Sequence, residues 1–211
     1  MKLSVLIPTV PSRFHLLNQF LDYVSHQKIE DVEFVIFADN YILSIGEKRN
    51  ILLEESSGDF IVFIDDDDWV HVRYFELLNQ VFCFKKVDYI GYMMARSFNG
   101  IVQPHEIRSI KYKRCFSDAY GTYRNVSHTN PIRRSIATQF KFPKKSQGED
   151  VDWCQQIFES KLIVREHFVN LPMYEQRFTD SNSSYKGTID KSISDSILAI
   201  PTSFPAKIIK S

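Results

Sequence analysis

Short apolar runs alternate with amphipathic stretches along the first 95 residues. The apolar runs cover residues 3–7, 32–38, 60–64 and 87–94, and their length and β-branched content predict strands. Between them, apolar residues recur at helical spacing over residues 12–24, 46–57 and 74–82. We expect Ser12 to cap the first helix and Gly58 to end the second. This alternation predicts an α/β fold with a mostly parallel central sheet and helices on both faces.

The strand at residues 60–64 ends in four consecutive aspartates, Asp65 to Asp68. Four adjacent carboxylates repel one another, so a strongly positive group is needed to hold them together at neutral pH. The carboxyl ends of parallel strands are also where open α/β folds bind their ligands. The first hypothesis is therefore a divalent cation carrying a phosphate-containing ligand, and the alternative is a solvated acidic turn.

The pattern loosens after residue 96. Residues 98–116 predict a hairpin or a flexible lid, and Asn130-Pro131 is expected to begin a short helix that runs to Ala137. An amphipathic helix should follow Gly148, and residues 162–168 form a further strand candidate. In the tail, only residues 188–199 have a helical pattern, and the sequence leaves open whether the chain is part of a multidomain protein.

Composition narrows the functional classes. The chain has 211 residues, 44% of them hydrophobic, with 26 basic and 26 acidic side chains, so no general basic surface exists for nucleic acid. Residues 1–95 carry a net charge of −7 and residues 96–211 carry +7. The three cysteines lie far apart, which predicts buried thiols rather than disulfides or a zinc site. No apolar run is long enough for a membrane span or a signal sequence, so we expect a soluble, cytoplasmic protein without a transmembrane segment.

Five stretches of the chain form a recognisable set of motifs. They are the opening Leu3-Ser4-Val5-Leu6-Ile7-Pro8-Thr9, Gly46-Glu47-Lys48-Arg49-Asn50, the block Gly58 to Asp68, Asn130-Pro131 and Gly148-Glu149-Asp150. Together they resemble the GT-A fold glycosyltransferases, in particular the inverting family 2. The motifs occur in one order across residues 3–178. More faintly, the compact module is similar to glycosyltransferase domains of large algal DNA viruses, which would place it in the host cytoplasm.

The resemblance implies a Rossmann-related GT-A sandwich with a smaller acceptor-side lobe. In that reading, residues 1–95 bind nucleotide-sugar and metal. Residues 96–187 bind the acceptor and supply the catalytic base, and residues 188–211 form a C-terminal helix or tail. The implied cofactor is Mn²⁺ or Mg²⁺, which prefers carboxylate oxygen and neutralises a diphosphate leaving group.

The family's D-x-D pattern maps onto Asp65, on the ribose side, and Asp67, the metal ligand. Asp66 and Asp68 form an equally good D-x-D, so the register stays open, although a further Asp after the motif favours Asp65/Asp67. Asp66 is counted among the nucleotide-sugar contacts, and Asp68 is a lower-grade candidate.

The resemblance also implies nucleotide contacts for residues before the aspartates. These are Pro8, Thr9, Arg13, Asp39 and Arg49. An acidic residue at the position of Asp39 accepts a hydrogen bond from the N3–H of uracil in the family, which favours a UDP-sugar donor. The alternatives are an Asx-turn for Asp39 and a surface salt bridge for Arg49.

For the catalytic base, the resemblance implies Asp150, with Glu149 contacting the acceptor. The alternative is that both carboxylates simply complement the dipole of the helix that they begin. His128 and Arg177 are lower-grade candidates for contacts to diphosphate or acceptor.

The expected function is a metal-dependent, inverting transfer of a sugar from a nucleotide diphosphate to a hydroxyl of a glycan or another acceptor. Two alternatives remain. One is a sugar-phosphate nucleotidyltransferase, although the Gly-rich loop of that class is missing after the first strand. The other is a non-catalytic nucleotide-sugar-binding or interaction module of a larger chain.

Overall fold

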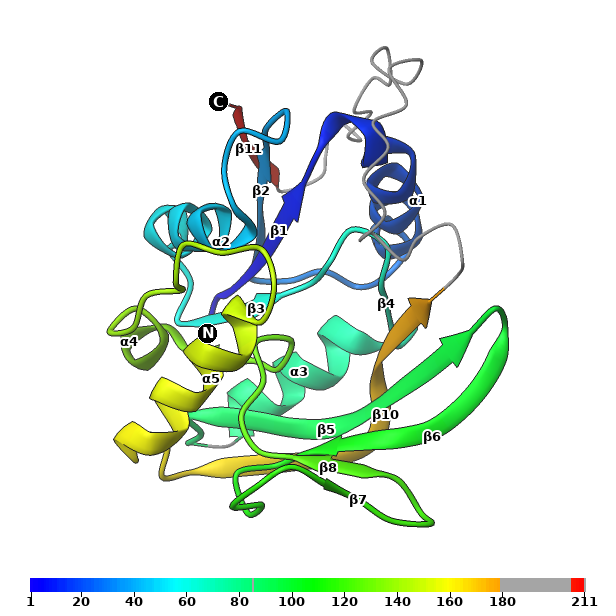
Figure 1. Ribbon diagram of the computed structural model, residues 1–211, viewed down its shortest axis with the longest axis vertical. Coiled ribbons are helices and arrows are strands. Elements are labelled where there is room, and N and C mark those ends of the chain that lie inside the picture. The colour runs from blue at the N-terminus through cyan, green and yellow to red at the C-terminus, as the bar shows by residue number, and fades with distance from the viewer. Residues whose placement is uncertain (85, 179–205, 211) are drawn as a thin grey trace.

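The N-terminal half forms a parallel sheet (Figure 1). The computed structural model describes residues 1–84, 86–178 and 206–210. Strands β1 (Leu3–Thr9), β2 (Val32–Ala38) and β3 (Phe60–Phe63) pair in parallel, with β1 in the middle. The strand β11 (Ala206–Lys210) adds to the free edge of β2, also in parallel.

Helices cover both faces of this sheet. On one face, α1 (Phe14–Ser25) and α3 (Tyr74–Phe84) bury their apolar sides against Val5, Phe34 and Val62. On the other face, α2 (Ile45–Glu55), α4 (Arg134–Ala137) and α5 (Glu149–Ser160) pack against Leu6 and Phe63. Alternate residues of each strand enter opposite cores, as the strand period requires. The prediction of an α/β sheet with helices on both faces is confirmed.

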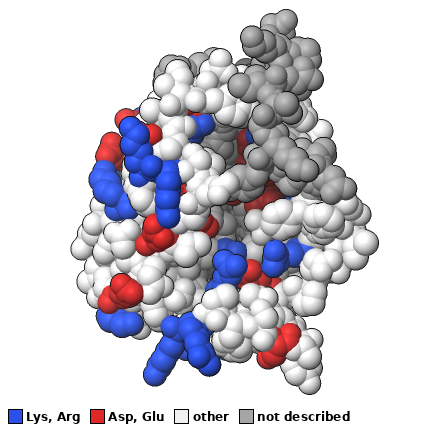
Figure 2. Space-filling view, in the orientation of Figure 1, with Lys and Arg blue, Asp and Glu red and all other residues white. Residues whose placement is uncertain are grey.

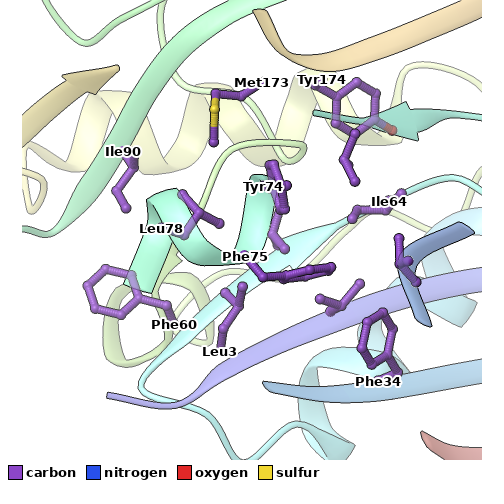
Figure 3. Packing of buried hydrophobic residues seen from close by; sticks show 14 of the residues in the cluster. Leu3, Phe34, Phe60, Ile64, Tyr74, Phe75, Leu78, Ile90, Met173 and Tyr174 are labelled. Atoms are coloured by element: carbon purple, nitrogen blue, oxygen red, sulfur yellow. The ribbon is translucent and has the colours of Figure 1, made fainter. Parts of the chain in front are cut away.

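The first core joins the two halves of the chain. Phe75 and Leu78 of α3 lie among strand residues of the N-terminal sheet, and Met173 and Tyr174 approach the same cluster from the far end of the chain (Figure 3). All of these side chains are almost completely buried. Burial of apolar surface therefore fixes the segment that carries Tyr174 against the carboxyl end of β3.

The C-terminal half is built on a long hairpin. Strands β5 (Tyr89–Phe98) and β6 (Ile101–Arg108) are antiparallel, and their turn at Asn99-Gly100 has positive φ at both residues (48° and 79°). Residues 98–116, for which a hairpin or a flexible lid was predicted, thus supply the turn and the second strand of a hairpin whose first strand is β5. Short strands β7 (Phe116–Ser117) and β8 (Thr122–Arg124) extend the sheet beyond β6, and β9 (Ile132–Arg133) joins β3 to β5.

The strand β10 (Glu166–Phe178) links this half to the aspartates. It runs parallel to β5 and pairs antiparallel with β4 (Trp69–Val70), which directly follows Asp68. The predicted strand over residues 162–168 was placed too early, because only its last residues belong to β10. The predicted helix over residues 188–199 lies outside the described residues.

Three local predictions were wrong. Ser12 lies in the 3-10 helix η1 (Pro11–Arg13), so α1 begins after Arg13 without a side-chain cap. Gly58 does not end α2, which stops at an extended Ser56. Gly58 instead allows close backbone approach, since a Cβ there would lie 2.7 Å from the amide nitrogen of Ser4. The short helix α4 begins at Arg134, because the residues after Asn130-Pro131 first form β9.

The cysteines only partly match expectation. Cys154 is buried, but Cys83 and Cys115 are exposed because they lie on the outer side of α3 and in the segment before β7. Within the described ranges, no helix is long and apolar enough to cross a membrane.

Candidate active site

The four aspartates form a turn at the carboxyl end of β3. The amide of Asp68 donates to the carbonyl oxygen of Asp65 at 3.1 Å, which closes the turn. Asp66 and Asp68 are buried, whereas the side chains of Asp65 and Asp67 are 33% and 17% exposed. The alternate pair Asp65/Asp67 therefore faces outward, while the pair Asp66/Asp68 faces protein.

Asp66 and Asp67 are held by Arg13. One nitrogen of its guanidinium, Nη2, lies 2.6 Å from Asp66 Oδ1 and 2.7 Å from Asp67 Oδ2, and Thr9 donates to Asp66 Oδ2 at 2.6 Å. Burial raises the pKa of Asp66 to about 7 despite the charge of Arg13. Burial also raises the pKa of Asp67, with the charge of Asp65 adding to the effect. These carboxylates thus need more positive charge than Arg13 supplies.

Tyr174 holds the turn from the other side. Its hydroxyl donates to Asp68 Oδ2 at 2.7 Å and accepts from the amide of Asp65 at 3.3 Å. The pKa of Asp68 is raised well above its usual range. Burial is the largest cause, and repulsion from the charges of Asp65 and Asp67 adds to it. Tyr174 was missed in the sequence, where it stands in a polar stretch without a recognised motif.

Arg49 connects the aspartate turn to the start of α5. Its guanidinium is buried, with Nη2 at 3.0 Å from Asp65 Oδ1 and Nε at 3.3 Å from Glu149 Oε1, and it lies 5.1 Å from the ring centre of Phe63. Burial disfavours ionisation of Asp65, but the charge of Arg49 outweighs it and lowers the pKa of that carboxyl. Burial raises the pKa of Glu149. The alternative of a surface salt bridge for Arg49 is wrong.

Asp39 ends β2 in a buried polar position. Its Oδ2 accepts from the amides of Ile42 and Leu43 at 2.8 and 2.7 Å, and its Oδ1 pairs with Lys48. The Asx-turn alternative is therefore present in the structure, and a contact to a nucleotide base stays a prediction. Pro8, half-buried, lies beside Thr9 at the same end of β1.

Asp150 stands in the first turn of α5, next to His128. Its Oδ2 lies 3.4 Å from Nδ1 of His128, and about a third of its side chain is exposed. Burial lowers the pKa of His128 well below its usual range, so the imidazole is neutral at pH 7. Its Nε2 is buried and has no hydrogen-bond partner within the described part of the chain. Nδ1 of His128 faces the carboxylate of Asp150, so the imidazole is placed to orient that carboxylate.

Arg177 completes the predicted set and lies beside Trp69. Arg177 pairs with Glu175 at 2.7 Å, lies 4.5 Å from the ring centre of Trp69 and donates its backbone N–H to Asp68. Trp153 is fully buried and stacks on Phe142, so it belongs to the core. The structure thus brings Thr9, Arg13, Arg49 and the four aspartates into one contact network, which reaches α5 through Glu149.

A metal ion at this site would need ligands from substrate or water in addition to those from the protein. Among the described residues, no group of three or more His, Cys, Asp or Glu side chains is arranged to hold a metal ion. The outward pair Asp65/Asp67 offers carboxylate oxygen, which suits a hard cation that takes its remaining ligands from substrate phosphates and water.

Comparison with known proteins gives a family match over part of the chain and a set of similar solved structures. Residues 43–140 match the family model "Glycosyl transferase family 2". The structure is similar to S. aureus TarS, solved over residues 1–349 in complex with UDP-GlcNAc. The TM-score is 0.66 at 18% identity, covering 84% of this chain and 58% of that one. It is also similar to glucosyl-3-phosphoglycerate synthase from Mycobacterium tuberculosis, solved with Mn²⁺, UDP and glucosyl-3-phosphoglycerate. There the TM-score is 0.54 at 14% identity, covering 83% of this chain and 72% of that one. No curated protein sequence matches the chain.

The fold is therefore that of the GT-A glycosyltransferases, and the resemblance to family 2 is confirmed. The chain spans only 37% of the longer TarS chain and 60% of its 1–349 form. The family match begins shortly before α2 and ends after α4, so it includes the aspartate turn and Arg49 but stops before Asp150.

Proposed function

We propose that this protein is a metal-dependent, inverting glycosyltransferase. It would move a sugar from a nucleotide diphosphate, with UDP the expected nucleotide, to a hydroxyl of a glycan or another acceptor. The observation that carries the proposal is the aspartate turn, where two carboxylates face outward on a rigid base of two buried ones. The family match over this turn supports the same activity.

The donor side is assigned to the ends of β1, β2 and β3. Asp65 and Asp67 would hold Mn²⁺ or Mg²⁺, which supplies Lewis-acid stabilisation of the leaving diphosphate. Arg13 pairs with Asp66 and Asp67, so it would lie beside the diphosphate that a metal on this turn carries. Pro8, Thr9 and Asp39 form the border of the nucleotide site, in keeping with the position of ligands at the carboxyl ends of strands.

The acceptor side is assigned to the start of α5. Asp150 is partly exposed at the start of α5, so its carboxylate can take the proton from an attacking hydroxyl. His128 positions this carboxylate through Nδ1. The carboxylate of Glu149 points instead toward Arg49. We therefore assign to Glu149 a structural role, which is to link the donor side to the acceptor side, rather than direct contact with the acceptor. In a single displacement the base and the leaving diphosphate act from opposite faces of the sugar, which inverts the anomeric centre.

The test is nucleotide release from a panel of sugar nucleotides, with and without Mn²⁺. The expected result is metal-dependent release from one donor, lost in Asp67→Asn and retained in Asp22→Asn, a matched change on the exposed side of α1. Asp150→Asn should keep donor binding and lose transfer to an acceptor by roughly 100-fold or more. Absence of binding and of turnover across the panel would favour the non-catalytic module, and pyrophosphate exchange with a sugar phosphate would favour the nucleotidyltransferase.

A further inference from the structure

Three arginines surround one buried glutamate in the C-terminal half. Glu106 of β6 is 2% exposed at its side chain, and its Oε1 lies 2.6 Å from Nε of Arg108 and 3.3 Å from Nε of Arg124. Its Oε2 lies 3.9 Å from Nη1 of Arg96 on β5. One carboxylate balances one guanidinium, so this arginine cluster (Arg96, Arg108 and Arg124 with Glu106) carries a net charge of +2.

The three arginines differ in how fully they are bonded. Arg108 is buried, and besides Glu106 it donates to the hydroxyls of Ser127 and Thr129. Arg96 and Arg124 lie at the surface, with side chains 35% and 43% exposed. The Nε of each is buried and lacks a hydrogen-bond partner within the ranges that the structure describes. Arg108 and Glu106 thus form a buried ion pair. Arg96 and Arg124 are surplus cations, which means that no further carboxylate of the cluster balances their charges.

Surplus cations at a half-buried position need a compensating partner. Like charges repel more strongly near the low-dielectric interior than in water, and buried N–H groups without acceptors cost free energy. The ring of Phe178, 5.6 Å from the guanidinium carbon, helps to hold Arg96 in place. Two pre-positioned and partly exposed guanidinium groups are suited to an anion, and their planar forks match the several oxygens of a phosphate.

The cluster lies next to the proposed catalytic base. Ser127 and Thr129, which bind Arg108, flank His128, and His128 contacts Asp150. Arg108 and Arg124 lie near enough that their charges help to lower the pKa of His128, after its burial and the charge of Arg49. In Figure 2, basic side chains gather beside an acidic one at the centre of this face, below a hollow with acidic side chains on its opposite side. An anion at the cluster would therefore lie on the acceptor side of the site.

We propose that Arg96 and Arg124, positioned by Glu106 and Arg108, bind a phosphate group of the acceptor, so that the acceptor is a phosphate-bearing molecule with a hydroxyl that reaches Asp150. This inference rests on the proposed glycosyltransferase function and names the chemical class of its acceptor. The diphosphate of the donor could occupy the same two arginines, and the experiment distinguishes a phosphate of the acceptor from the diphosphate of the donor.

The experiment is a calorimetric titration with inorganic phosphate, on the free protein and on the protein saturated with UDP and Mn²⁺. We expect phosphate to bind in both states, and Arg96→Gln and Arg124→Gln each to weaken it about tenfold or more. Arg114→Gln removes the same charge from an exposed position of the same half and should leave phosphate affinity unchanged. Equal weakening by Arg114→Gln, or no binding by the unaltered protein at millimolar phosphate, would overturn the proposal.

Two further outcomes are decisive. If saturating UDP abolishes phosphate binding, the cluster serves the donor diphosphate and the acceptor assignment is wrong. If Arg124→Gln lowers the melting temperature strongly and leaves phosphate affinity unchanged, the cluster is only a structural ion network. UDP binding is measured in the same samples, so failure of the proposed function shows as lost UDP binding, whereas failure of this inference leaves UDP binding intact.

Discussion

Replacing Arg49 with methionine is expected to destabilise the protein by about 3 kcal/mol. The two ion pairs of Arg49, at 3.0 Å to Asp65 and 3.3 Å to Glu149, are each worth roughly 5 kcal/mol in Coulomb attraction at an effective dielectric constant near 20. Removing the guanidinium also removes its desolvation cost, and broken buried pairs lose about 3–5 kcal/mol in practice. The lower end applies here because Asp65 is one-third exposed and methionine keeps the packing against Phe63.

The assay is urea unfolding at pH 7.5 and at pH 5. Without Arg49, the already raised pKa of Glu149 rises further, so the folded variant binds a proton more readily than its unfolded chain. The variant therefore regains stability as the pH falls, and the loss should be smaller at pH 5. Adding Glu149→Gln to the variant should recover about 1–2 kcal/mol, because it removes the uncompensated buried charge.

A matched control is Arg73→Met on the surface near α3, where the arginine pairs with Glu76 and is more than half exposed. Exposed pairs contribute about 0–1 kcal/mol, so this variant should lose less than 1 kcal/mol. A loss below about 1 kcal/mol for Arg49→Met, or a loss that is equal at the two pH values, would refute the view that Arg49 holds two desolvated carboxylates.

Two other predictions follow from the same local chemistry. Because the folded pKa of Asp66 is about 7, above its unfolded value, the metal-free protein should lose stability as the pH rises from about 4 to about 7, and Asp66→Asn should reduce that loss by up to about 4 kcal/mol. An equally steep loss in the variant, measured by urea unfolding across this range, would contradict the assignment. Ser44 caps α2 and forms a capping box with Glu47, so Ser44→Ala should cost about 1 kcal/mol, while Ser12→Ala, at a position that caps no helix, should cost less than half of that in the same thermal melts.

The alternating half of the fold could be predicted because each element carries its own local pattern. Leu6 and Val5 point to opposite cores simply because they are neighbours on a strand buried on both faces. The spacing Ser44 to Glu47 is a capping-box signal that was present in the sequence and was overlooked, whereas Ser12 has the right residue type without the cap geometry. Residue type alone does not decide a cap; the backbone conformation does.

The candidate site could be predicted only where its residues form one motif. The aspartates could be recognised, but which pair faces outward depends on a turn closed from Asp68 to Asp65 and on Tyr174, far along the chain. The arginine cluster has no local motif, although residues 96–211 carry a net charge of +7, because Arg96 and Arg124 come together through strand pairing across β5, β6 and β8. The local periodicity of the sequence does not predict which distant strands pair with one another.

The edge strand β11 has a consequence for synthesis of the chain. It covers the side of β2 that would otherwise present unpaired backbone groups, yet it lies roughly 170 residues further along the sequence. At about 5–20 residues per second, the ribosome exposes an apolar, unprotected β2 for roughly 10–30 s before its neighbour is made. During that interval β2 is a template for pairing with other nascent chains. Slower translation of the second half should therefore reduce the soluble yield, and chaperones that shield extended segments should restore it.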